Sequence, residues 1–112
     1  MKDLKNRLIE KADELEWSVN IDGDDWEFEK YSPAGEDFIF TVSVDAPEEV
    51  WREVRRYAND FDTEEHIEMW VEAKKNLVSG IPSIRRLVED ADDIDKMLDE
   101  LADALRDVTE VS

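Results

Sequence analysis

Apolar residues in the first part of the chain follow a helical spacing. Between residues 3 and 16 they recur every three or four positions, and Asp3 stands before them as a candidate N-cap. We expect an amphipathic helix over this range, because one apolar stripe lets a helix pack against a core.

The spacing then changes to two, which is the period of side chains along a strand. Apolar and polar residues alternate in three runs, over 17–21, 26–29 and 38–44. A turn sequence at 22–25 joins the first two runs, and a segment with Pro and Gly at 32–35 separates the second from the third. We therefore expect three antiparallel strands in a meander. The aromatic residues on its covered face are Trp17, Trp26, Phe28, Phe38 and Phe40.

Helical spacing returns in the second half of the chain. Asp45 is a candidate N-cap for the first of these stretches, with Glu48 at capping-box spacing and apolar residues over 50–58. Thr63 is a candidate N-cap for the next. Both stretches are predicted to be amphipathic helices.

The last stretch follows an expected loop at 78–82. Its apolar residues run from 84 to 108, either as one long helix or as a short helix followed by a longer one. The whole order is α-β-β-β-α-α-α. This order predicts a single α+β domain over 1–112, with helices packed on one face of a three-stranded antiparallel sheet.

The composition supports one folded domain and removes several classes of function. Of 112 residues, 41% are hydrophobic and none is cysteine, which excludes disulfides, thiolate nucleophiles and Cys-based metal sites. No apolar run approaches the roughly 20 residues needed to span a bilayer, and the N-terminal segment lacks a signal peptide's apolar stretch. We expect a cytoplasmic protein without membrane contact.

Negative charge dominates the chain and is unevenly distributed. There are 32 acidic and 14 basic residues, a formal net charge of −18, which repels nucleic acid and attracts a basic partner. The net charge is −1 over 1–16, −7 over 17–45, −4 over 46–80 and −6 over 81–112. The strands and the last helix are therefore two acidic zones. Their candidate partner-binding residues are Asp22, Asp24, Asp25, Glu27 and Glu29 in the strands and Asp92, Asp95, Asp99, Asp103 and Asp107 in the helix.

Metal and cofactor chemistry has little support in the sequence. The only histidine, His66, stands among Glu65, Glu68 and Glu72, but the zinc signature H-E-x-x-H requires a second histidine. We expect His66 to be exposed in the first turn of its helix. The turn around Gly23 lacks the glycine and glutamate spacing of a calcium-binding EF-hand. No catalytic, cofactor or metal site is predicted.

One carboxylate pattern resembles a known enzyme family. The segments 65–68 and 89–92 resemble the E-x-x-E and E-x-x-D pair of the all-α nucleoside triphosphate pyrophosphohydrolases. The resemblance implies carboxylates on facing helices that hold Mg²⁺ and offset the charge of phosphates. The predicted sheet departs from the helical bundle of that family. A Mg²⁺-dependent pyrophosphohydrolase is one alternative to a protein without catalytic activity.

The size, charge and acidic spacing of the whole chain resemble another class of proteins. Carboxylates three or four positions apart on a helix lie about 5 to 6 Å apart, and DNA also presents a regular row of anions. Small, acidic, cysteine-free proteins of this kind resemble the phage and mobile-element inhibitors that block restriction enzymes or CRISPR effectors by imitating DNA. The resemblance implies a non-catalytic inhibitor of a basic nucleic-acid-binding protein, such as a host defence nuclease or effector complex.

Two further alternatives remain for the acidic surface. An acidic protein-interaction module without mimicry would bind its partner mainly through apolar anchors. A small protein of a halophile would carry its excess charge evenly, and the nearly neutral first helix counts against that.

Overall fold

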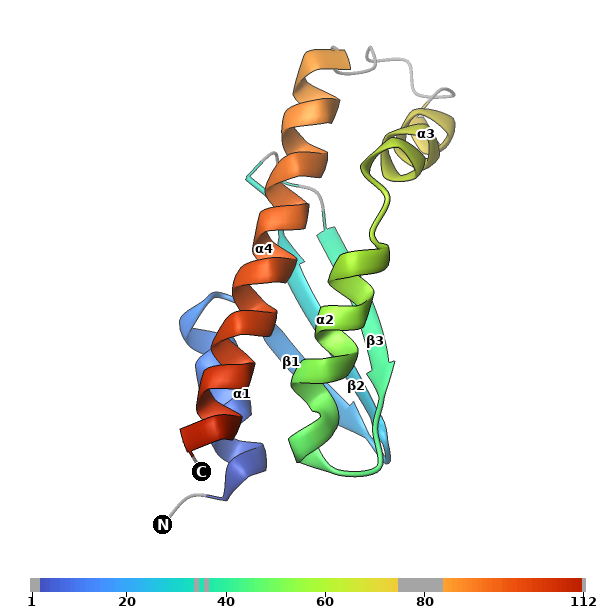
Figure 1. The fold of residues 1–112 in the computed structure, drawn as a ribbon. Coiled ribbons are helices and arrows are strands. Elements are labelled where there is room, and N and C mark those ends of the chain that lie inside the picture. The colour runs from blue at the N-terminus through green and yellow to red at the C-terminus, as the bar shows by residue number, and fades with distance from the viewer. Residues whose placement is uncertain (1–2, 34, 36, 75–83, 112) are drawn as a thin grey trace.

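The predicted α+β architecture is confirmed (Figure 1). The computed structural model describes residues 3–33, 35, 37–74 and 84–111, apart from the side chains of 70–74 and 84–87. The expected loop at 78–82 lies outside these residues. The last helical stretch is one continuous helix. The elements are α1 (Leu4–Glu14), β1 (Ser18–Asp22), β2 (Asp25–Tyr31), β3 (Asp37–Ser43), the 3-10 turn η1 (Pro47–Glu49), α2 (Val50–Asp60), α3 (Thr63–Lys74) and α4 (Ile84–Val111).

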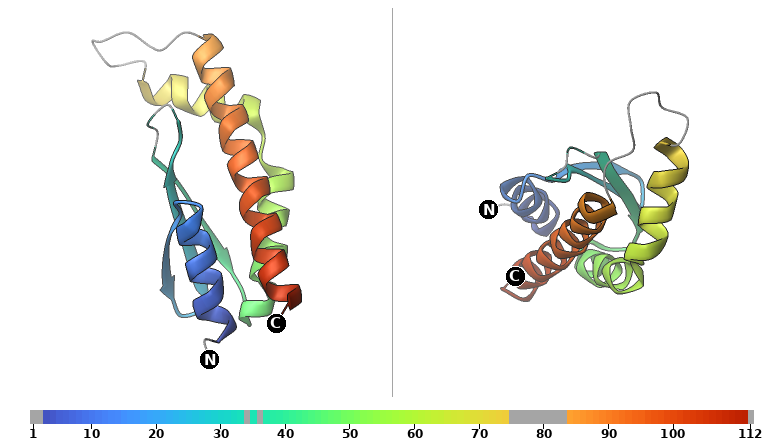
Figure 2. Two further views of the ribbon diagram at one scale, coloured as in Figure 1. Left: turned by 90° about the vertical axis from the view of Figure 1, so that its left-hand side faces the viewer. Right: turned by 90° about the horizontal axis from the view of Figure 1, so that it is seen from above.

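The three strands form the expected meander. Their order is β1-β2-β3, both pairs are antiparallel, and Phe28 at the centre pairs with Val19 on one side and Phe40 on the other. The β1–β2 loop contains Gly23 at a φ of 61°, a conformation that glycine adopts without a steric penalty. Figure 2 shows α1, α2 and α4 on the same side of the sheet. The molecule is therefore a two-layer sandwich with one sheet face turned away from its helices.

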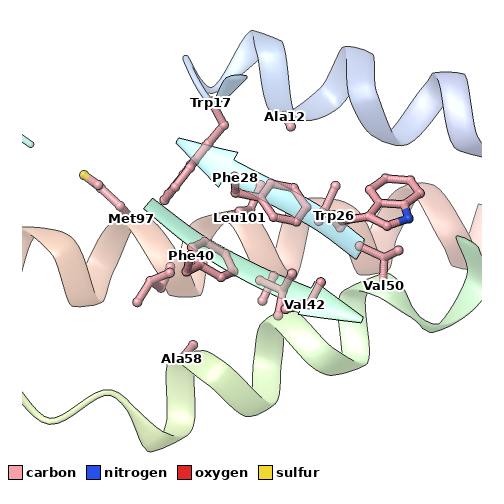
Figure 3. Packing of buried hydrophobic residues seen from close by; sticks show 14 of the residues in the cluster. Ala12, Trp17, Trp26, Phe28, Phe40, Val42, Val50, Ala58, Met97 and Leu101 are labelled. Atoms are coloured by element: carbon pink, nitrogen blue, oxygen red, sulfur yellow. The ribbon is translucent and has the colours of Figure 1, made fainter. Parts of the chain in front are cut away.

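An aromatic cluster joins the sheet to the helices (Figure 3). The buried Trp17 lies edge-on to Phe40, with ring centroids 5.6 Å apart, and edge-on to Phe28 and Phe38 at 6.4 Å each. Tyr57 of α2 stacks on Phe40 at 4.6 Å. The sequence correctly placed these rings in the core. The helices add smaller buried side chains, among them Ala12, Val50, Val54, Ala58, Ile94, Leu98, Leu101 and Leu105.

Both ends of α1 are capped. The Asp3 side chain accepts a hydrogen bond from the Asn6 backbone N–H at 2.9 Å, so the predicted N-cap is confirmed. At the other end the Lys30 ammonium donates to the Leu15 carbonyl at 2.8 Å, beside the ring of Trp17. A cation at this end of a helix also interacts favourably with the helix dipole. Lys30 therefore ties β2 to α1.

Two predicted N-caps were wrong. The cap of α3 is Asp62, whose Oδ1 accepts from the backbone N–H groups of Glu64 and Glu65, and not Thr63, which is already helical. Asp45 does not cap α2 either. The chain enters through η1, and the Glu49 carboxylate accepts from the Asp45 backbone N–H. At α3 two adjacent residues with similar capping ability make the cap ambiguous in sequence, whereas at α2 no side chain caps the helix.

Glu16 offers a test of local strain in the turn after α1. Its φ is 70°, and the N–H groups of Glu16 and Trp17 close the helix by donating to Asp13 and Ala12. Glycine adopts this conformation more readily, so Glu16→Gly should raise the free energy of unfolding by about 0.5–1 kcal/mol in urea denaturation. Glu16→Ala removes the same charge but keeps Cβ. Equal stabilisation by both substitutions would refute the backbone explanation.

Candidate partner-binding surface

Strand alternation produces a surface that we call the outer sheet face. Trp26, Phe28, Phe40 and Val42 point into the core, so the side chains between them point away from the helices. No described element covers this side of the sheet (Figure 2). The outer sheet face consists of Ser18, Asn20 and Asp22 of β1, Asp25, Glu27, Glu29 and Tyr31 of β2, and Asp37, Ile39, Thr41 and Ser43 of β3.

The outer sheet face carries five carboxylates and no basic side chain. Asp25, Glu27 and Glu29 form a line along β2, Asp22 lies opposite Asp25 on β1, and Asp37 lies at the start of β3. Side chains two positions apart on a strand are separated by about 6.8 Å. The structure therefore brings together four residues predicted to bind a partner, with Asp37 beside them. The fifth predicted residue of this zone, Asp24, lies exposed in the β1–β2 loop.

Repulsion within this face acts on Glu29. The negative charge of Asp37 is the main cause that raises the pKa of Glu29 above its usual 4.5. Desolvation, a side-chain hydrogen bond with Asp37 and the charge of Glu27 act in the same direction. Asp25 has a local partner, because the Ser43 hydroxyl donates to its Oδ1. Within the described part of the chain, the face is thus an array of acids without an opposing cation.

Two large apolar side chains share the outer sheet face. Tyr31 is 63% exposed and Ile39 is 47% exposed. Tyr31 pairs with Asp37 and Ile39 pairs with Glu29, which places the two apolar residues diagonally across β2 and β3. The outer sheet face therefore contains an exposed apolar pair, Tyr31 and Ile39, at one end. The sequence pattern did not reveal this pair.

The second predicted zone, the aspartate row of α4, has different surroundings. Arg55 of α2 binds Asp99 through Nη1 at 3.1 Å and Asp103 through Nη2. Arg106 lies 3.9 Å from both Asp103 and Asp107. Three of the five aspartates in this row thus have a cation close by. The sequence analysis missed Arg55, because nothing in the local pattern of α2 relates it to residues 44 and 48 positions away.

The remaining aspartates of the row lie nearer the start of α4. Asp92 is exposed and Asp95 is partly buried. Desolvation, followed by the charges of Asp99 and Asp92, raises the pKa of Asp95. Arginines therefore neutralise part of the negative charge on this helix, and burial disfavours the charged form of Asp95.

The structure does not bring the two acidic zones together. The buried side of α4 packs through Ile94, Leu98 and Leu101 into the core that the sheet also faces. The outer sheet face points away from that core, whereas Asp99 and Asp103 lie at the contact between α4 and α2. The helix–sheet core separates the zones, so one continuous flat surface cannot contact both.

The described carboxylates form no metal centre. Among the described residues no group of three or more His, Cys, Asp or Glu side chains converges as metal ligands. His66 is not the exposed residue that the sequence predicted, because it is partly buried with its ring 5.4 Å from that of Phe61. In the other carboxylate segment Asp90 is buried, and neither carboxylate oxygen has a hydrogen-bond partner in the described structure. The arrangement implied by the pyrophosphohydrolase resemblance is absent from these residues.

Comparisons with known proteins identified no family for the chain. Neither the protein-family models nor the curated proteins nor the solved structures gave a match to the chain. Within the described residues, no helix combines the length and apolar character required to cross a membrane. The chemistry of the outer sheet face is therefore the basis for a proposed function.

The pair Glu29 and Asp37 provides a test of the electrostatics. Asp37→Asn should lower the pKa of Glu29 toward its ordinary value, measured by an NMR pH titration of the Glu29 side-chain carboxyl carbon. A raised folded-state pKa means that stability increases as pH falls from neutral through that pKa. This increase should become smaller in Asp37→Asn. Glu110→Gln, on α4, is the control, and an equal change of the Glu29 pKa there would contradict the assignment.

Proposed function

We propose that the chain is a non-catalytic inhibitor that imitates nucleic acid. Its partner is a basic nucleic-acid-binding protein, such as a host defence nuclease or effector complex, and its contact surface is the outer sheet face. The observation that carries the proposal is the set of five carboxylates on this face without a basic side chain among them. Basic grooves that hold phosphates attract such a surface by charge complementarity.

The spacing on β2 supports this choice of partner. From Asp25 to Glu29 the strand extends about 14 Å, since each residue adds about 3.4 Å. One strand of duplex DNA places about four phosphates along the same length of helix axis. Asp25, Glu27 and Glu29 therefore present a sparser row of anions over a comparable distance, with Asp22 and Asp37 widening it.

The ion pairs in the middle of the α4 row favour the outer sheet face as the contact surface. A basic groove that approached Asp99 and Asp103 would compete with Arg55, which already binds both carboxylates. Among the described residues, no Lys or Arg is paired with the carboxylates of the outer sheet face in this way. We therefore propose that Asp99 and Asp103 hold α2 to α4 and that the α4 row, including Asp92, Asp95 and Asp107, lies outside the contact surface.

The apolar pair Tyr31 and Ile39 favours a second candidate, an acidic protein-interaction module without mimicry. Tyr31 and Ile39 are large, exposed and adjacent to the carboxylates of the face. Aromatic side chains are enriched among the residues that dominate binding energy at protein interfaces. In this candidate the carboxylates orient the partner and the apolar pair holds it.

Competition with DNA tests the proposed inhibitor directly. The purified chain is added to a panel of restriction nucleases and CRISPR effector complexes, and cleavage of a duplex target is measured at low salt and at about 0.15 M salt. We expect inhibition of at least one nuclease that weakens as salt is added. Glu27→Gln, Glu29→Gln and Asp37→Asn combined should weaken it about tenfold or more, or about 1.4 kcal/mol.

A matched variant separates this surface from total charge. Asp13→Asn, Glu48→Gln and Glu110→Gln combined remove the same charge from exposed positions elsewhere and should leave inhibition within about twofold. The absence of inhibition across the panel at low salt would refute the proposal. Equal weakening by both triple variants would show that only bulk charge matters.

The apolar pair distinguishes the second candidate. If the chain is an interaction module, Tyr31→Ser with Ile39→Thr should abolish binding to a captured partner, and that binding should persist at high salt. If the chain imitates nucleic acid, the same variant should retain most of its inhibition. Val111→Thr, at an exposed apolar position on α4, is the control for the loss of surface hydrophobicity. Affinity is measured by isothermal titration calorimetry.

A further inference from the structure

A pocket of about 370 Å³ lies beside the outer sheet face. It is formed where β3 begins, where α2 ends and where α3 starts, a junction that can be followed in Figure 1. Asp37 and Ile39 belong both to its lining and to the outer sheet face. A partner bound on that face would therefore contact residues that also line the pocket.

Aromatic rings form much of the pocket wall. Phe38 and Phe61 lie edge-on with centroids 5.9 Å apart, and Tyr57 lies 6.4 Å from Phe38. Burial raises the pKa of Tyr57, so its phenol stays neutral at physiological pH. The faces of such rings carry partial negative charge and attract cations.

Carboxylates surround these rings. Asp37, Asp60, Asp62 and Glu65 all line the pocket together with His66, and the described part of its lining contains no Lys or Arg. Asp62 is partly engaged, because it caps α3 through the backbone N–H groups of Glu64 and Glu65. Asp60 and Glu65 are exposed. Within the described residues the pocket therefore combines apolar walls with several carboxylates and no arginine such as Arg55, which binds the middle of the α4 row.

We propose that this pocket receives the guanidinium of an arginine side chain from the basic partner. The source of that arginine rests on the proposed function, while the match between pocket and guanidinium does not. A guanidinium is planar, is weakly hydrated and stacks on aromatic faces, and its five N–H donors bind carboxylates in pairs. An ammonium has neither the plane nor the paired donors, so the pocket prefers arginine to lysine.

Titration of the whole chain with Nα-acetyl-arginine amide tests the pocket without any partner. We expect saturable NMR shifts at Phe61, Glu65 and His66, and a binding constant at least about fivefold tighter than for Nα-acetyl-lysine amide. The citrulline analogue, which has the same shape without the charge, should produce almost no shift. Shifts spread evenly over surface acids, or equal responses to all three compounds, would overturn the assignment.

A pair of variants locates the binding site. Asp60→Asn with Glu65→Gln should weaken arginine amide binding about fivefold or more, whereas Glu48→Gln with Glu110→Gln removes the same charge elsewhere and should leave it unchanged. Equal effects of the two pairs would also refute the pocket. Circular dichroism confirms that each variant is folded.

The two proposals fail in different ways. If arginine amide binds in the pocket but the chain inhibits no nuclease, the proposed function is wrong and the pocket assignment stands. If the chain inhibits a nuclease but arginine amide does not bind, the pocket assignment is wrong and the function stands.

Discussion

Packing of the aromatic sheet face against the helices is the constraint on which the rest of this molecule depends. Trp17 meets the rings of Phe28 and Phe40 at the centre of the core, and α4 covers them with aliphatic side chains. Once this face is buried, the period of two along a strand turns every intervening side chain outward. Glu27 and Glu29 therefore face away from the helices as a direct consequence of the core. A slip of one residue in register would bury these carboxylates instead.

The carboxylates on the two sides of the sandwich have different surroundings. On the helical side Arg55 bridges Asp99 and Asp103, so charge there contributes to the contact between α2 and α4. On the sheet side repulsion from Asp37 raises the pKa of Glu29, and the Ser43 hydroxyl donates a hydrogen bond to Asp25. Repulsion left in the free protein would be removed by a cationic partner. This asymmetry distinguishes the outer sheet face more sharply than the net charge does.

Most of the fold could be predicted because its signals are local. Alternation identified the strands, helical spacing identified the helices, and Asp3 was correctly recognised as a cap. The cap at Thr63 was wrong because the adjacent Asp62 accepts the backbone hydrogen bonds instead. The cap at Asp45 was wrong because the chain enters α2 through η1, where no side chain caps the helix. The carboxylates on β2 were found for the same reason as the strands. The arginine that pairs with the α4 row was missed, because its contact joins residues distant in sequence.

By itself the sequence determined the order of elements, the aromatic core and the two acidic zones, since periodicity and composition are properties of neighbouring residues. Only the tertiary structure decided that the zones lie apart, that Arg55 neutralises part of one, and that Phe38, Tyr57 and Phe61 line a pocket with carboxylates beside the other. These features are contacts between separate elements. They depend on how α2, α3 and α4 pack around the sheet, which no local pattern specifies.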